Sequence, residues 1–378
     1  MTDTENSVGI VTPQRFVFDE PIALEAGSEL RHYELVVETY GELNSDASNA
    51  VLICHALSGN HHAAGRHSPE DAKPGWWDLV IGPGKPIDTD RLFVVSLNNL
   101  GGCDGSTGPA SATHDGGDLW GPDFPQVTVN DWVETQRRLA SRLGISRWAA
   151  VIGGSLGGMQ ALQWSVSYPD WVDHCVIVAA APSLTAQNIA FNEIARQAIY
   201  ADPDWRDGNY LAANAQPTTG MALARMVGHL TYMSADRMSD RFGRDLRSGS
   251  FAPDSSEAPL FEVESYLRYQ GEQFSTRFDA NTYILMTRAL DRFDISDTAK
   301  GDLCNAISEV QSDFLVISFS SDWRFAPNRS KELVDALVAN GKSVSYANIE
   351  SDGGHDAFLL ENEDYLAIFS AWMKRVAA

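Results

Sequence analysis

Ser155 lies in the segment of the chain best suited to nucleophilic chemistry. It is the centre of a G-x-S-x-G motif, Gly153 to Gly157, which follows an apolar β-like run at 148–152 and precedes a helix-like run at 156–168. Glycines on either side of the serine permit a tight turn because they carry no Cβ. The sequence therefore predicts an exposed serine hydroxyl at a strand-to-helix turn, with the N-terminus of a helix behind it.

A base and an acid in the correct order follow this serine. A serine hydroxyl attacks efficiently only when a neighbouring base takes its proton, and an acid must fix the tautomer of that base. Asp322 follows the apolar run 314–319, and His355 follows the apolar run 344–349. The order Ser, Asp, His, with the last two residues on loops after late strands, is typical of α/β-hydrolases. We predict that these three residues form a catalytic triad.

Other candidates for the base and the acid are less suitable. His355 is the only histidine after His229, so it has almost no competitor as the base. Asp313 precedes its strand, which would place it at the wrong edge of the sheet, and Asp352 is very close to His355 in sequence. The structural alternative is a glycine-rich turn, a surface aspartate and a loop histidine that never meet.

Attack on a carbonyl would create an oxyanion, which two backbone N–H groups usually stabilise. One should belong to Leu156, directly after the serine. The other should belong to the loop after the apolar run 51–54, where we predict Leu57. The alternative for residues 57–59 is an ordinary structural turn.

Composition restricts the class of protein. The 378 residues include 28 basic and 51 acidic side chains, for a formal net charge of −23. This balance disfavours nucleic-acid and anionic membrane partners, because phosphate neutralisation needs clustered Lys and Arg. The four cysteines show no C-x-x-C spacing, and we expect them to be reduced. Since neither a signal-like N-terminus nor a long apolar run is seen, we expect a cytoplasmic protein without a membrane segment.

Short apolar runs alternate with helix-like segments, which predicts an α/β fold with a mostly parallel sheet. The predicted strands are 33–39, 51–54, 92–97, 148–152, 175–179, 314–319 and 344–349. A helix is expected to begin at Asn130 as N-cap. The alternation stops between residues 184 and 302, where several helices, including 219–232 and 281–293, predict an inserted cap. The α/β core would then comprise residues 1–183 and 303–378.

Longer motifs carry a resemblance to one family. They are Gly153-Gly-Ser-Leu-Gly157, His55-Ala-Leu-Ser-Gly59, Asn98-Asn-Leu-Gly-Gly102, Gly353-Gly-His-Asp356, Pro74-Gly-Trp-Trp-Asp78 and Phe278-Asp-Ala-Asn-Thr282. With them, nearly the whole chain resembles the homoserine O-acyltransferases of methionine biosynthesis, which have the α/β-hydrolase fold. The resemblance implies a serine that passes an acyl group from acyl-CoA to homoserine, a helical lid and a homodimer built through it. It implies no metal and no bound cofactor.

The resemblance also implies how homoserine is held. By matching motifs, Arg225 in the inserted region and Asp356 beside the base would bind its carboxylate and its amine. A zwitterion in a partly dry site needs one cation and one anion, and arginine suits a carboxylate through its fork of donors. The alternatives are a solvated arginine on a helix face and an aspartate that only caps a loop.

Arg324 indicates which acyl group is transferred. Acetyl-transferring members of the family usually carry an uncharged residue two positions after the catalytic aspartate, whereas this chain carries a guanidinium. Such a charge is costly in an acetyl pocket and favourable if the acyl chain ends in a carboxylate. A succinyl group supplies such a carboxylate, and this departure resembles the branch of the family that uses succinyl-CoA. We therefore predict a homoserine O-succinyltransferase. The alternative for Arg324 is a salt bridge to a surface acid.

Several rival functions share the same residues. They are transfer of acetyl from acetyl-CoA, acylation of serine in place of homoserine, and hydrolysis by an esterase or thioesterase. A catalytically inactive scaffold on the same fold belongs to a different class, which the intact Ser, Asp, His order disfavours.

Overall fold

An eight-stranded sheet forms the centre of the computed structural model, which describes residues 6–114, 116–249, 251, 255 and 258–378. Its strand order is β1-β4-β8-β5-β9-β10-β11-β12. The strands are β1 Gln14–Phe18, β4 Tyr33–Tyr40, β5 Ala50–Cys54, β8 Phe93–Leu97, β9 Trp148–Gly154, β10 Val172–Val178, β11 Asp313–Phe319 and β12 Val344–Ile349. Two short pairs flank it: β2 Ile22–Ala23 with β3 Glu29–Leu30, and β6 Ile81–Gly82 with β7 Ile87–Asp88.

From β8 to β12 the neighbouring strands are parallel, whereas β4 pairs antiparallel with both β1 and β8. The carboxyl ends of β5, β9, β11 and β12 therefore meet at one edge of the sheet. In open α/β sheets this edge is where ligands bind. The predicted parallel sheet is confirmed.

Helices cover both faces of the sheet, as expected for parallel strands. They are α1 Val129–Arg142, α2 Leu156–Ser167, α3 Ala186–Tyr200, α4 Thr218–Tyr232, α5 Ala235–Phe242, α6 Glu262–Ser275, α7 Ala280–Arg292, α8 Leu303–Ala306, α9 Pro327–Ala339 and α10 Glu363–Val376. The first apolar core lies between the sheet and α1, α2 and α9. The second lies on the opposite face, where α10 and residues 63–87 cover the sheet.

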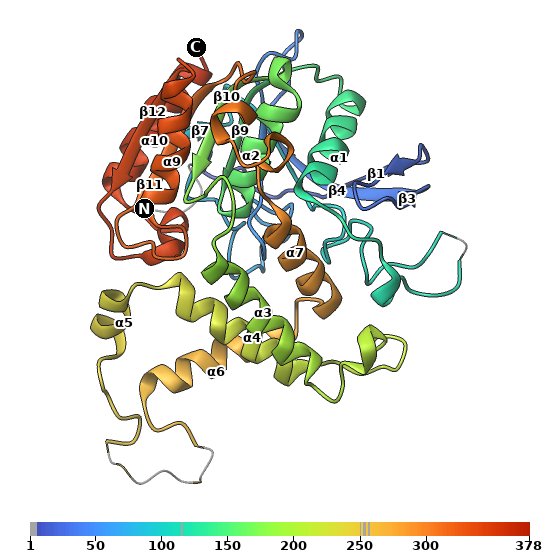
Figure 1. Ribbon diagram of the computed structural model, residues 1–378, viewed down its shortest axis with the longest axis vertical. Coiled ribbons are helices and arrows are strands. Elements are labelled where there is room, and N and C mark those ends of the chain that lie inside the picture. Colours follow the sequence, from blue (N-terminus) through green and yellow to red (C-terminus); the bar gives the residue numbers. More distant parts are fainter. Residues whose placement is uncertain (1–5, 115, 250, 252–254, 256–257) are drawn as a thin grey trace.

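The helices α3 to α7 are inserted between β10 and β11. Figure 1 shows α3, α4, α5 and α6 together below the sheet, with α7 between them and the core. The C-terminal half of α7 belongs to the main core, because Leu285, Met286 and Leu290 are buried there. Helix α7 is thus one attachment of the inserted helices to the core. The predicted boundaries of the cap at 184 and 302 stay a prediction.

One local prediction was wrong, and one strand of the main sheet was missed. The first predicted helix is capped by Thr128 and not by Asn130, because the Thr128 side chain accepts from Asp131 N at 3.2 Å and the Asp131 carboxylate accepts from Thr128 N at 2.8 Å. This reciprocal capping box satisfies two free N–H groups at once. Strand β1 was not predicted, since most of its side chains are exposed and its order depends on pairing with β4.

Candidate active site

Ser155 occupies a strained turn between β9 and α2. Its backbone has φ 57° and ψ −125°, a region that favours glycine, and its N–H donates to Val178 O at 2.9 Å. The glycines on both sides are sterically required. A Cβ on Gly153 would lie 2.1 Å from the carbonyl carbon of Gly157, and a Cβ on Gly157 would lie 2.0 Å from Cys54 O. The close packing holds the serine at the carboxyl edge of the sheet.

The structure brings the three predicted triad residues into contact. His355 Nε2 lies 2.8 Å from Ser155 Oγ, and His355 Nδ1 lies 2.8 Å from Asp322 Oδ2. All three residues are buried: His355 is 3% exposed, Ser155 8% and Asp322 2%. An ionised carboxylate can only accept, so Nδ1 donates to Asp322 and Nε2 is free to accept the serine proton. This is the geometry of a general base poised on a nucleophile, while the catalytic role of each residue stays a prediction.

The acid is held by the backbone of its own loop. Asp322 Oδ1 accepts from the N–H groups of Arg324 and Phe325, both at 2.9 Å. Two donors to one oxygen restrict the rotation of the carboxyl group. The other oxygen of Asp322 is therefore directed at the imidazole.

The end of α4 is bonded to the loops that carry the acid and the base. Trp323 Nε1 donates to Met233 O at 3.1 Å, and Ser234 Oγ donates to Asp352 O at 2.5 Å. Gly354 has φ 66°, and a Cβ there would lie 2.4 Å from the last carbonyl oxygen of α4. These contacts fasten the inserted helices directly to the two loops.

The two predicted oxyanion donors lie on adjacent segments. Leu156 is the first residue of α2, and Leu57 lies in the turn that Gly59 N closes on Ala56 O at 2.9 Å. Within the described residues neither the Leu57 amide nor the Leu156 amide donates a hydrogen bond to the protein. Both amides are therefore available to a ligand oxygen, and their role as an oxyanion hole stays a prediction.

His55 and Gln160 support this loop, and we did not assign them a role from the sequence. His55 Nδ1 donates to Ala56 O at 2.7 Å, so its Nε2 accepts from Asn99 N at 3.1 Å. Burial lowers the pKa of His55 to about 4, which keeps this imidazole neutral. Gln160 Nε2 donates to His55 O at 3.1 Å. A buried polar network of this kind specifies one loop conformation.

Arg225 and Asp356, unlike the triad residues, are not bonded to each other. The Arg225 guanidinium on α4 stacks over the rings of Phe274, at 4.7 Å, and Tyr232, at 5.5 Å, and its Nε is buried without a hydrogen-bond partner. Burial raises the pKa of the Asp356 carboxyl, which the nearby charges of His355 and Arg225 oppose. The two form no direct ion pair in the part of the chain that the structure describes. A ligand with both charges could bind between them.

Arg324 is buried among neutral acceptors. Its side chain is 8% exposed, and Nη1 donates to Thr231 Oγ1 at 2.8 Å while Nη2 donates to Asn192 Oδ1 at 3.3 Å. Its guanidinium also lies 5.5 Å from the ring of Tyr232, which stands 6.0 Å from the His355 ring. No carboxylate of the described residues pairs with Arg324, so the predicted alternative of a surface salt bridge is wrong.

Thr231, Asn192 and Tyr232 were missed in the sequence because they lie in the insertion, where only helices were predicted. Asn192 is oriented by its own bond, Nδ2 to Asp291 Oδ1 at 2.7 Å, so that its carbonyl oxygen faces Arg324. No sequence motif marks either contact.

Comparison with known proteins identifies the family. A family model described as alpha/beta hydrolase fold matches residues 49–362. The homoserine O-succinyltransferase of Litchfieldella anticariensis is 62% identical over 374 residues, which are 98% of this chain and 95% of that protein. The homoserine O-succinyltransferase of Ectopseudomonas mendocina is 61% identical over 372 residues, 98% of each chain. The chain belongs to the homoserine O-acyltransferase family.

Solved structures agree with this membership of the homoserine O-acyltransferase family. Homoserine O-acetyltransferase from Bacillus anthracis superposes with a TM-score of 0.89 at 30% identity, covering 97% of this chain and 98% of that one. Esterase E22 superposes with a TM-score of 0.87 at 28% identity, covering 98% and 100%. The predicted α/β-hydrolase fold and the predicted family are both confirmed. Since an acetyltransferase and an esterase fit almost equally well, the fold does not select the substrate.

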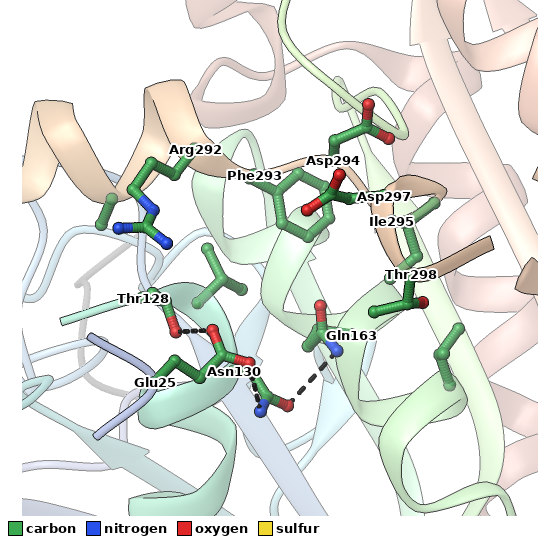
Figure 2. Close-up of a pocket in the computed structure, with 13 residues that line it drawn as sticks. Glu25, Thr128, Asn130, Gln163, Arg292, Phe293, Asp294, Ile295, Asp297 and Thr298 are labelled. Carbon is green, nitrogen blue, oxygen red and sulfur yellow. Dashed lines mark hydrogen bonds between the residues drawn. The ribbon is translucent and has the colours of Figure 1, made fainter. Parts of the chain in front are cut away.

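This member of the homoserine O-acyltransferase family has a hollow away from the triad residues, which none of the predicted site residues line. It lies between α1, α2 and the end of α7 (Figure 2). Glu25 accepts there from Thr128 Oγ1 at 2.6 Å and from Asn130 Nδ2 at 2.9 Å, and Gln163 Nε2 donates to Asn130 at 3.3 Å. These polar groups largely satisfy one another.

Among the described residues, no helix is both long and apolar enough to cross a lipid bilayer.

Proposed function

We propose that this chain is a homoserine O-succinyltransferase, which transfers the succinyl group of succinyl-CoA to the hydroxyl of L-homoserine. The observation that carries the proposal is Arg324, a buried guanidinium next to the acid loop with only neutral acceptors. A buried cation without an anion is costly, and the distal carboxylate of a succinyl group would supply that anion. The relatives named homoserine O-succinyltransferase, at 62 and 61% identity, support the same function.

In the first half-reaction, His355 Nε2 takes the proton of Ser155 Oγ, which attacks the thioester carbonyl. The Leu57 and Leu156 amides would stabilise the oxyanion. Collapse of the tetrahedral intermediate breaks the carbon–sulfur bond, and the imidazolium gives its proton to the departing CoA thiolate. A succinyl ester on Ser155 remains, and Asp322 stabilises the transient imidazolium without taking its proton.

In the second half-reaction, His355 removes the proton from the homoserine hydroxyl, whose oxygen attacks the succinyl ester. The carbon–oxygen bond to Ser155 then breaks, and the serine regains its proton from His355. Arg225 would bind the homoserine carboxylate and Asp356 its ammonium group. Two observations support these roles. The Nε of Arg225 has no hydrogen-bond partner, and among the described residues Arg225 and Asp356 form no direct ion pair.

The test of the acyl specificity replaces Arg324 by leucine. Loss of a charge-assisted contact of about 1.5–3 kcal/mol lowers kcat/KM for succinyl-CoA about 10- to 100-fold, while kcat/KM for acetyl-CoA stays equal or rises. Arg329→Leu is the matched control, because Arg329 pairs with Glu332 on α9 and lies outside the proposed site. An unchanged ratio of the two donors in Arg324→Leu would sink the proposal.

A second experiment distinguishes transfer from hydrolysis and homoserine from serine. CoA release is followed with succinyl-CoA alone, with homoserine and with serine, and Ser155 is inspected by mass spectrometry after a short incubation with donor alone. We expect a succinyl adduct, slow turnover without acceptor and fast turnover with homoserine. Rapid CoA release without acceptor would instead indicate a thioesterase.

We propose that the protein is a homodimer joined through the inserted helices. Large apolar side chains are exposed there, including Ile194 on α3, Leu223 and Leu230 on α4, and Tyr269 on α6. Leu223 and Leu230 are seven residues apart and so lie on one face of α4. Light scattering after size exclusion should give twice the chain mass for the wild type and a monomer for Leu223→Glu.

A further inference from the structure

A fully buried carboxylate lies on β4 and is surrounded by imidazoles that do not belong to the triad. Glu38 is 0% exposed, and its Oε2 accepts from Tyr40 Oη at 2.7 Å and lies 3.0 Å from His62 Nδ1. Two further histidines from the loop after β5, His61 and His67, face the same carboxylate. Nothing in the proposed acyl transfer uses this cluster.

The second oxygen of Glu38 is shared with His62, whose Nδ1 lies 3.2 Å from it, and it also faces His67 and His61. Oε1 lies 2.6 Å from His67 Nε2, and 3.7 Å from His61 Nε2, which is too long for a hydrogen bond. His61 is 6% exposed, and its Nδ1 also lacks a partner. The His61 imidazole thus makes no side-chain hydrogen bond within the described residues. Buried polar groups are normally satisfied, so this one needs an explanation.

We propose that Glu38, His61 and His67 bind a divalent transition-metal ion of the zinc class. Their ligand atoms all lie within 4.8 Å of one another. Tetrahedral zinc with bonds of about 2.0–2.2 Å separates two ligand atoms by about 3.4 Å, and the separations from Glu38 Oε1, 2.6 and 3.7 Å, lie on either side of that value. Two imidazoles and a carboxylate form a ligand set that zinc accepts, with water as fourth ligand.

The neighbouring groups suit such a site. Tyr40 donates to Oε2, and His62 Nδ1 lies 3.0 Å from Oε2 and 3.2 Å from Oε1. These two groups orient the carboxylate so that Oε1 faces His61 and His67, as outer groups commonly orient metal ligands. The side chain of His67 is 42% exposed, so it can move back to admit the ion and opens the site to solvent. A network held by hydrogen bonds alone would explain His62 and His67 but would leave His61 without a partner.

The ion would have a structural effect. It would tie the loop that contains Leu57, His61 and His67 to strand β4 at Glu38. The triad side chains take no part in it, so the proposal does not depend on the acyl-transfer chemistry.

The test uses the full-length protein after chelator treatment and dialysis. Zn²⁺ is titrated by calorimetry, Tm is measured with and without the ion, and Co²⁺ is added to look for the intense visible absorption of a tetrahedral site. We expect one equivalent bound, a higher Tm, and binding more than about 100-fold weaker in His67→Asn and His61→Gln. Circular dichroism of the metal-free variants checks that both fold.

The matched control is His114→Asn. His114 stacks on His32 with 4.2 Å between ring centroids, so this surface pair could bind zinc adventitiously. The control should keep one equivalent of Zn²⁺ and the Co²⁺ spectrum. The proposal is overturned if the wild type binds no stoichiometric ion, or if the two site variants bind it as tightly as the wild type does. If one of them does not fold, the other decides.

Discussion

Replacement of Thr231 by valine would isolate one contact that holds the Arg324 guanidinium. Thr231 is fully buried, and its Oγ1 accepts from Arg324 Nη1 at 2.8 Å while it donates to Gly228 O at 2.8 Å. Valine keeps the shape and removes both bonds. A hydrogen bond to a charged group contributes about 1.5–3 kcal/mol, and about 1.4 kcal/mol corresponds to a tenfold change. We therefore expect kcat/KM for succinyl-CoA to fall about tenfold, with acetyl-CoA changed less than about twofold.

Thr287→Val separates this contact from the loss of a helix bond. Thr287 is also fully buried, and its Oγ1 donates to Ile284 O at 3.0 Å, one turn back in α7, with no arginine bonded to it. Both variants lose a helix bond, and Thr231→Val should lose more stability in urea unfolding because it also removes the bond to the buried Arg324. Only Thr231→Val should change the ratio of succinyl-CoA to acetyl-CoA activity in a steady-state CoA-release assay. The reasoning is refuted if the two variants share one donor profile, or if Thr231→Val slows both donors equally.

Three further predictions follow from the same contacts. Ser155→Gly and Ser155→Ala should both lose the succinyl adduct seen by mass spectrometry. The glycine variant should be more stable than the alanine variant by about 1 kcal/mol, because a backbone φ of 57° is unstrained only for glycine. Equal Tm values for the two variants would contradict strain at this turn. Burial lowers the pKa of His229 to about 4, so between pH 4 and the ordinary value of 6.5 the unfolded chain binds more protons and stability falls as pH falls. His229→Gln should remove up to about 1.4 kcal/mol per pH unit of that slope in urea unfolding at pH 5 and 7, and an unchanged slope would exclude this histidine as its source. Arg225→Lys should raise KM for homoserine about tenfold because lysine lacks the bidentate fork, with KM for succinyl-CoA unaffected; a change confined to the donor would contradict the assignment.

The parts of the fold and site that could be predicted from the sequence have local signals. The turn at Ser155 lies between a strand and a helix whose periodicities differ, and Asp322 and His355 each follow an apolar strand directly. A helix was predicted at 219–232, and α4 is Thr218–Tyr232. Ser155, Asp322 and His355 meet at one edge of the sheet because they follow the parallel strands β9, β11 and β12.

The remaining features depend on contacts between distant segments. Asn192 and Thr231 reach Arg324 across 132 and 93 residues of sequence, and nothing in their surroundings distinguishes them from other polar helix residues. Similarly, the cap at Thr128 depends on the competition between two good N-cap residues, which the position of Asp131 decides. The histidines around Glu38 meet only because β4 passes beneath the loop after β5.

The bonds from Trp323 to Met233 and from Ser234 to Asp352 have a consequence for the fate of the acyl-enzyme. If α4 moves away, these bonds break and the loops that carry Asp322 and His355 lose part of their support. Bulk water could then enter, but the base that must activate it would be misaligned. The base keeps its full support only while both bonds are made, and in the proposed function homoserine would then occupy the space beside it. A transferase on a hydrolase fold could protect its ester intermediate in this way.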